Sequence, residues 1–80
     1  MQKMIKMPKL SDKMEKGVLV AWTKKPGQTV KKGEVIFELE TDKVVSEIES
    51  MENGTLEQVL FHEGDEVKVD EIVAVIECSE

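Results

Sequence analysis

Hydrophobic and polar residues alternate along several short stretches of the chain. In 35–41, Val35, Phe37, Leu39 and Thr41 fall on one face and Glu38 and Glu40 on the other. In 44–50, Val44, Ser46 and Ile48 oppose Glu47 and Glu49, and in 72–78 the inner face would carry Ile72, Ala74, Ile76 and Cys78. A period of two is that of a half-buried β-strand, so these stretches predict three strands.

Weaker sequence signals also indicate short strands joined by turns. The stretches 18–23 and 56–61 are rich enough in β-branched or aromatic residues for strands, although their alternation is less regular. Turn signals stand at short spacing at Pro26-Gly27, Asn53-Gly54 and Glu63-Gly64-Asp65. No stretch of 12 or more residues combines helical periodicity with caps. The 80 residues therefore predict a single all-β domain spanning 1–80.

The chain contains an internal repeat. A shift of 37 residues lays 14–41 over 51–78 without a gap and gives nine identities in 28 positions. Random pairing at this composition gives roughly two. Two copies are too few for a solenoid, so the repeat predicts a closed domain with a pseudo-two-fold axis, in which both halves share one core.

The junction between the two halves contains a short link. The strands predicted at 35–41 and 44–50 leave only Asp42 and Lys43 to connect them, which is a tight hairpin with its tip in solvent. Asp is a good turn residue, but a turn does not require Lys. Taken alone, Lys43 is either a solubilising residue or a target for acylation, which would remove its charge and attach a long group.

Composition and charge exclude several function classes. Eleven Lys and no Arg stand against 17 Asp plus Glu, for a net charge of −6, which argues against nucleic acid as a partner. No apolar run approaches the ~20 residues of a membrane span, and the N-terminus lacks the apolar region of a signal peptide. One His and one Cys argue against a protein zinc site and a Cys/His catalytic pair. The residues thus predict a carrier or binding domain with no catalytic or metal-ligating residues of its own.

Charge is divided unevenly along the chain. Residues 1–32 carry nine Lys and two acids, a local charge of +7, whereas residues 33–80 carry two Lys and 15 acids, a local charge of −13. This division fits either a solvated surface of mixed sign or an acidic region that frames a recognised site.

Several segments, in order, resemble the lipoyl domains of 2-oxo acid dehydrogenase complexes, most closely the pyruvate or acetoin type. The resemblance covers nearly the whole chain, and 34–43, with Thr41-Asp42-Lys43, is its most diagnostic segment. The segment 7–12 is similar to the family's opening strand and loop, and 17–22 followed by 25–30 is similar to its second strand and turn. Gly54, 63–67 and 72–76 complete the pattern.

The resemblance implies a flattened barrel-sandwich of two four-stranded antiparallel sheets. It also implies that Lys43 carries lipoic acid in amide linkage, on a turn formed with Thr41, Asp42 and Val44. The chain would then be a swinging-arm carrier and not an enzyme by itself, within a dihydrolipoamide acyltransferase. Its implied partners are a lipoate ligase or lipoyl transferase, a thiamine-diphosphate decarboxylase, the acyltransferase core and dihydrolipoamide dehydrogenase.

Two groups of residues are expected to contribute to partner recognition. The resemblance suggests that the loop containing Ser11, Asp12, Lys13 and Met14 lies beside the turn and selects the decarboxylase. The other group is acidic: Glu40, Asp42, Glu47 and Glu49 are expected to crowd around Lys43 and to steer a positively charged partner. Of these, Glu40 and Glu49 are the additional recognition candidates.

Three other functions compete with the lipoyl carrier. A biotin carrier domain of a carboxylase shares the fold and the turn but typically places Met on both sides of its lysine, whereas Asp42 and Val44 flank Lys43. The glycine-cleavage carrier is longer, and an unmodified barrel-sandwich interaction module would not need the lysine. The single Cys fits a reducing compartment, so we expect a cytoplasmic location, or the mitochondrial matrix in a eukaryote.

Overall fold

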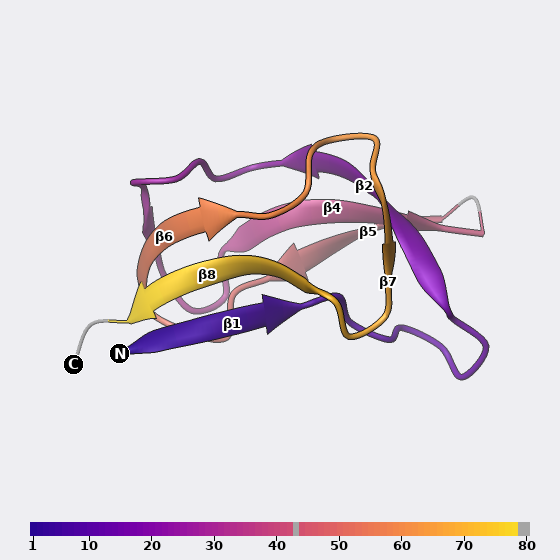
Figure 1. Cartoon of the computed structure of the whole chain (residues 1–80), viewed down its shortest axis with the longest axis horizontal. Coiled ribbons are helices and arrows are strands. Elements are labelled where there is room, and N and C mark those ends of the chain that lie inside the picture. The colour runs from indigo at the N-terminus through magenta and orange to yellow at the C-terminus, as the bar shows by residue number, and fades with distance from the viewer. Residues whose placement is uncertain (43, 79–80) are drawn as a thin grey trace.

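The computed structural model describes residues 1–42 and 44–78, and the strands below lie within them. The strands are β1 (Gln2–Lys6), β2 (Lys16–Trp22), β3 (Thr29–Val30), β4 (Val35–Thr41), β5 (Val44–Glu49), β6 (Gly54–Val59), β7 (Glu66–Lys68) and β8 (Ile72–Cys78). They form two four-stranded antiparallel sheets with the orders β1-β8-β6-β3 and β5-β4-β2-β7 (Figure 1). The predicted fold class is confirmed.

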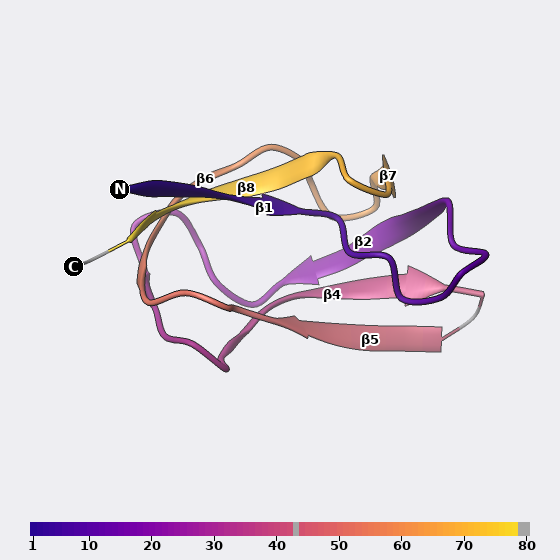
Figure 2. The same ribbon diagram turned by 90° about the horizontal axis from the view of Figure 1, so that it is seen from below.

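The two sheets stack as layers around one core. Figure 2 shows β1, β6 and β8 on one side and β2, β4 and β5 on the other. The domain is elongated, with extents of 36 × 21 × 19 Å. Its buried core consists of Met7, Met14, Leu19, Val30, Ile36, Phe37, Leu39, Leu56, Val67, Val73, Ala74 and Ile76. No helix in the described part of the chain has the length and apolarity needed to cross a membrane.

The predicted pseudo-two-fold relation is visible in the hydrogen bonds. Gly33 N–H donates to Ser50 O over 2.9 Å, and the equivalent Asp70 N–H donates to Met7 O over 3.1 Å. Both donors have positive φ, 93° for Gly33 and 74° for Asp70. The halves therefore repeat each other's backbone, and β1 in one half takes the place of β5 in the other.

Strand irregularities shift some residues away from the predicted faces. The pairing of β4 with β5 changes register between Val35 and Phe37, and Ile36 and Phe37 are both buried. Strict alternation would have placed Ile36 outside, so that prediction is wrong, because a bulge moves the neighbouring side chains relative to the sheet. Ile72, expected inside, is 37% exposed at the start of β8, and Val44 is 59% exposed.

The first strand lies earlier than the resemblance implied. The segment 7–12 was expected to open with a strand, but β1 covers Gln2–Lys6 and no strand is formed in 7–12. Met7 is instead a fully buried anchor, since its N–H donates to Glu71 O over 2.8 Å and its carbonyl accepts from Asp70. The loop that follows is therefore fixed where it leaves the core.

Trp22 and Cys78 both pack against the core from partly exposed positions. Trp22 is half-buried, with its ring centroid 5.2 Å from that of Phe37, and its Nε1–H donates to Phe61 O over 3.0 Å. Cys78 is half-buried against the core at the end of β8, as its strand pattern predicts. Both residues therefore contribute to packing.

Candidate functional site

The link between β4 and β5 is the tight turn that the sequence predicts. Thr41 pairs with Val44, which leaves only Asp42 and Lys43 between the strands. Asp42 has φ of 47°, in the left-handed region that Asp tolerates better than most residues. Lys43 itself, the predicted attachment site, lies outside the described residues.

The turn lies at one end of the long axis of the domain, whereas the start of β1 and the end of β8 lie at the opposite end (Figures 1 and 2). This separation follows from the pseudo-symmetry, because Thr41 corresponds to Cys78 and Cys78 N–H donates to Met1 O over 2.8 Å. The first half thus ends in a turn, whereas the second half ends with β8, beside the start of β1. The turn is therefore separated from the start of β1 and the end of β8 by the length of the domain.

A hollow of about 300 Å³ lies directly beside the turn. Its walls come from the loop (Ser11, Lys13, Met14, Glu15), from β2 (Lys16, Gly17, Val18), from the end of β4 (Glu40, Thr41), from Asp42 and from Glu66. The expected neighbourhood of loop and turn is therefore present in the structure. Asp12 is exposed on the same loop.

Met14 supports this loop from within. Its side chain is 9% exposed and belongs to the core, and its Sδ accepts the N–H of Leu10 over 3.2 Å. Met14 N–H donates to Ser11 O over 3.1 Å. We predicted Met14 as a residue that a partner contacts, but its burial leaves little surface for contact, so it holds the loop in place.

Exposed apolar residues near the turn were missed in the sequence analysis. Leu10 is 45% exposed on the loop, and Val44 and Val45 are 59% and 53% exposed at the start of β5. The available signal was Val44-Val45 itself, since two successive residues of a strand point to opposite faces and one of them must face outward. The surface near the turn therefore contains exposed apolar side chains as well as carboxylates.

The acidic residues that were expected around Lys43 lie in two separate parts of the domain. Glu40 and Asp42 are exposed at the turn, and Lys16 pairs with Glu66 over 3.3 Å at the hollow. Glu49, however, pairs with Val35 at the far end of β5. At ~3.3 Å per residue, the strand carries Glu49 roughly 15–20 Å from the turn. The expectation that Glu49 crowds around Lys43 is therefore wrong, and Glu47 lies about halfway along the same strand.

Comparison with known proteins assigns the family. The family model described as "Biotin-requiring enzyme" matches residues 3–76. The chain belongs to the biotin/lipoyl domain family. A solved lipoyl domain of the 2-oxoglutarate dehydrogenase complex from Azotobacter vinelandii superposes with a TM-score of 0.77 at 35% identity, covering 92% of this chain and 94% of that one.

Components of two kinds of complex are among the curated relatives of this biotin/lipoyl domain. The succinyltransferase component of the 2-oxoglutarate dehydrogenase complex of Bacillus subtilis is 44% identical over 72 residues, which are 90% of this chain and 17% of that protein. The acetyltransferase component of the pyruvate dehydrogenase complex of Rhizobium meliloti is 45% identical over 73 residues, 90% of this chain and 16% of that protein. The chain thus spans about a sixth of these relatives, and identity does not favour one 2-oxo acid over the other.

Proposed function

We propose that this domain is a lipoyl carrier, with lipoic acid linked through an amide to Nζ of Lys43. The observation that carries the proposal is the pairing of Thr41 with Val44, which sets Asp42-Lys43 as a two-residue link at the free end of the domain. Relatives whose names contain dihydrolipoyllysine, at 44–45% identity, support lipoic acid as the attached group.

The described residues around the link fit an attached arm. Asp42 is exposed and Val44 is 59% exposed, so neither would bury an amide-linked chain. Lipoic acid, when bound, supplies a dithiolane that can take up an acyl group together with two electrons. The domain's own residues position the attachment point, because β4 and β5 hold the link between them. The loop beside the hollow offers a surface for partner selection.

The proposed partners follow from this role. A ligase or transferase attaches lipoate, a thiamine-diphosphate decarboxylase loads the arm, an acyltransferase core receives the acyl group, and dihydrolipoamide dehydrogenase reoxidises the arm. A reducing compartment, the cytoplasm or the mitochondrial matrix, remains our prediction for the location.

Intact mass spectrometry tests the attachment. The domain is incubated with a lipoate ligase, lipoic acid and ATP, and in parallel with a biotin ligase, biotin and ATP. We expect the mass of one lipoyl group to be gained in the first reaction and peptide mapping to place it on Lys43. Lys43→Gln should gain nothing, whereas the matched control Lys13→Gln, which removes another lysine near the turn, should gain one group.

Other outcomes of this experiment identify the alternatives. If the domain gained biotin but no lipoyl group, it would be a biotin carrier and not a lipoyl carrier. The family description also covers this alternative. No gain in either reaction, from a folded domain, would favour an interaction module without a covalent group.

A further inference from the structure

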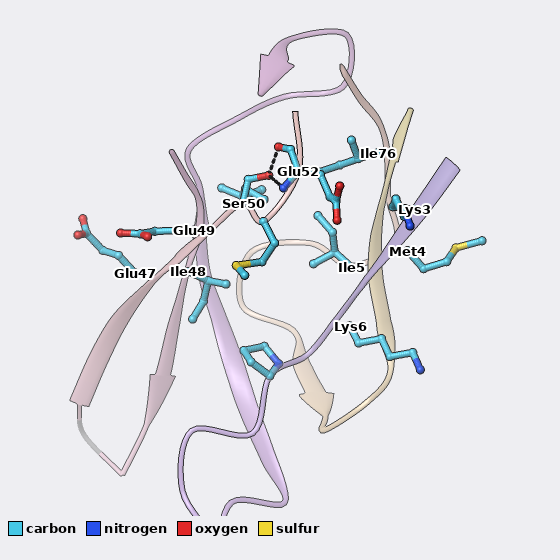
Figure 3. A pocket seen from close by; sticks show the side chains of 13 residues that line it. Lys3, Met4, Ile5, Lys6, Glu47, Ile48, Glu49, Ser50, Glu52 and Ile76 are labelled. Atoms are coloured by element: carbon cyan, nitrogen blue, oxygen red, sulfur yellow. Dashed lines mark hydrogen bonds between the residues drawn. The ribbon is translucent and has the colours of Figure 1, made fainter. Parts of the chain in front are cut away.

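A groove runs along the side of the domain between the two sheets, away from the hollow at the turn. It has a volume of about 490 Å³ and lies between β1, the edge strand of one sheet, and β5, the edge strand of the other. Ile5 and Ile48 face each other across it (Figure 3), and Met51 and Pro8 add apolar surface. Met4 and Met51 are 54% and 74% exposed.

Both rims of this groove are open strand edges. Within residues 1–42 and 44–78, β1 pairs with β8 alone and β5 with β4 alone. An edge strand presents N–H and C=O groups that can pair with another strand. The groove therefore offers two edges that could accept strands, with an apolar floor between them.

The two rims carry opposite charges. Lys3 and Lys6 extend from β1, and Glu47 and Glu49 extend from β5 (Figure 3). None of these four side chains forms an ion pair with any other residue that the structure describes. One rim is therefore basic and the other acidic, and neither charge is neutralised within the chain.

Opposite charges on antiparallel rims make the groove complementary to itself. β1 and β5 run in opposite directions along the long axis (Figures 1 and 2). A two-fold axis parallel to the groove would place β1 of one copy against β5 of a second copy, antiparallel, and would do so twice. Each basic rim would then meet an acidic rim, and the apolar floors would face each other.

We infer that this groove is an interface for a second copy of the chain, joined by β1–β5 strand pairing at both rims. The pairing joins the sheets of the two copies edge to edge and covers Met4 and Met51. It leaves the hollow beside the turn uncovered, because none of the residues that line the hollow lines the groove. The strands have only five and six residues, so the association is weak and depends on concentration.

Sedimentation equilibrium with charge-reversed variants tests the inference. Over a roughly hundredfold range of concentration, the average mass should rise from 9.0 kDa toward twice that value, and less so at high salt. Lys3→Glu with Lys6→Glu should stay monomeric, and so should Glu47→Lys with Glu49→Lys, because each places like charges on both rims. Lys25→Glu with Lys32→Glu makes the same charge change on loops outside the groove and should associate like the parent.

Mixing the two monomeric variants decides the result. In a mixed pair, the acidic β1 of the first variant pairs with the basic β5 of the second variant. The unchanged acidic β5 of the first variant pairs with the unchanged basic β1 of the second, so association should return. Circular dichroism confirms that each variant is folded, and the recovery itself excludes misfolding as the reason for the loss. A parent mass that stays at one chain at every concentration, or a mixture that remains monomeric, would overturn the second copy as the occupant of the groove.

Discussion

The backbone N–H of Gly27 donates to the carbonyl oxygen of Leu56 over 2.7 Å. The equivalent Gly64 N–H donates to Leu19 O over the same 2.7 Å, and both glycines have φ near 95°. In each half of the domain, the turn therefore forms a backbone hydrogen bond with a buried strand of the other half. These reciprocal bonds explain why two repeats form one closed unit, since neither half satisfies its backbone alone.

The symmetry exposes one position where the second half is strained. Asp70 adopts φ of 74°, and its equivalent Gly33 adopts 93° without the cost of a Cβ. We expect Asp70→Gly to raise the free energy of unfolding by about 0.5 kcal/mol, since relief of the strain outweighs the added freedom of the unfolded chain. The reverse change, Gly33→Asp, should lower it. Urea unfolding followed by Trp22 fluorescence measures both, and a destabilised Asp70→Gly would contradict the argument.

A second symmetric pair predicts unequal costs. A Cβ at Gly17 would meet the Leu39 side chain below the turn, whereas a Cβ at Gly54 would meet the backbone of Glu77 and Cys78. A leucine methyl can rotate away, but a strand backbone cannot move without breaking its pairing. Gly17→Ala should therefore cost about 1–2 kcal/mol of stability and Gly54→Ala more than that. Equal losses in urea unfolding would show that the core responds in the same way at both sites.

Much of this architecture was predictable from the sequence, and the exceptions have physical causes. Alternation located β4 and β5, and the 37-residue repeat predicted the two-fold relation. β3 has two residues and β7 has three, too few for a period of two to be recognised. β1, with sequence QKMIK, lacks a clear apolar face because one of its sides borders an open groove.

The candidate site was predictable in part for a related reason. The loop and the turn were correctly expected to be neighbours, because the resemblance carries the order of the elements. Glu49 was misplaced because closeness in sequence was taken as closeness in space, although an extended strand separates residues by ~3.3 Å at each step. Met14 was expected to contribute to partner recognition, and only the packing of the loop shows that its side chain is buried and that its sulfur accepts a backbone N–H.

Exchange of the two link residues tests the geometry of attachment. Asp42→Lys with Lys43→Asp keeps the composition and charge of the link but moves the amine by one residue, to a position with φ of 47°. The folded variant should accept no lipoate, because the amine then leaves the turn in another direction. Intact mass after ligase treatment checks this prediction, and modification as fast as in the parent would show that the ligase does not read position.

Glu34 predicts a specific dependence of stability on pH. The Lys31 N–H donates to its carboxylate over 2.7 Å and Lys24 Nζ lies 3.4 Å away, and together these hold the pKa of Glu34 below the ordinary value of 4.5. A depressed pKa stabilises the folded state above the ordinary value, and this contribution is lost as the pH falls through the lowered pKa. Glu34→Gln should therefore melt below the parent at neutral pH and approach it in acid. Glu15→Gln removes an exposed carboxylate without a side-chain hydrogen bond or ion pair among the described residues, and it should melt close to the parent at neutral pH.

Charge at the turn should govern how fast a decarboxylase partner meets the domain. Glu40 and Asp42 are exposed at the turn, whereas Glu49 lies beyond a Debye length of about 8–10 Å from it. Glu40→Gln with Asp42→Asn should lower the rate of reductive acylation several-fold at low salt and have little effect at high salt, since steering acts through encounter. The matched control, Glu47→Gln with Glu49→Gln, removes the same charge farther along β5 and should have a smaller effect.

Asp12→Asn with Lys13→Gln, on the loop beside the hollow, leaves the net charge unchanged and should slow acylation at every salt concentration, because it alters the surface that a partner contacts. If the turn variant were acylated more slowly by the same factor at all ionic strengths, Glu40 and Asp42 would be making direct contacts with the decarboxylase. The turn as well as the loop would then select the partner.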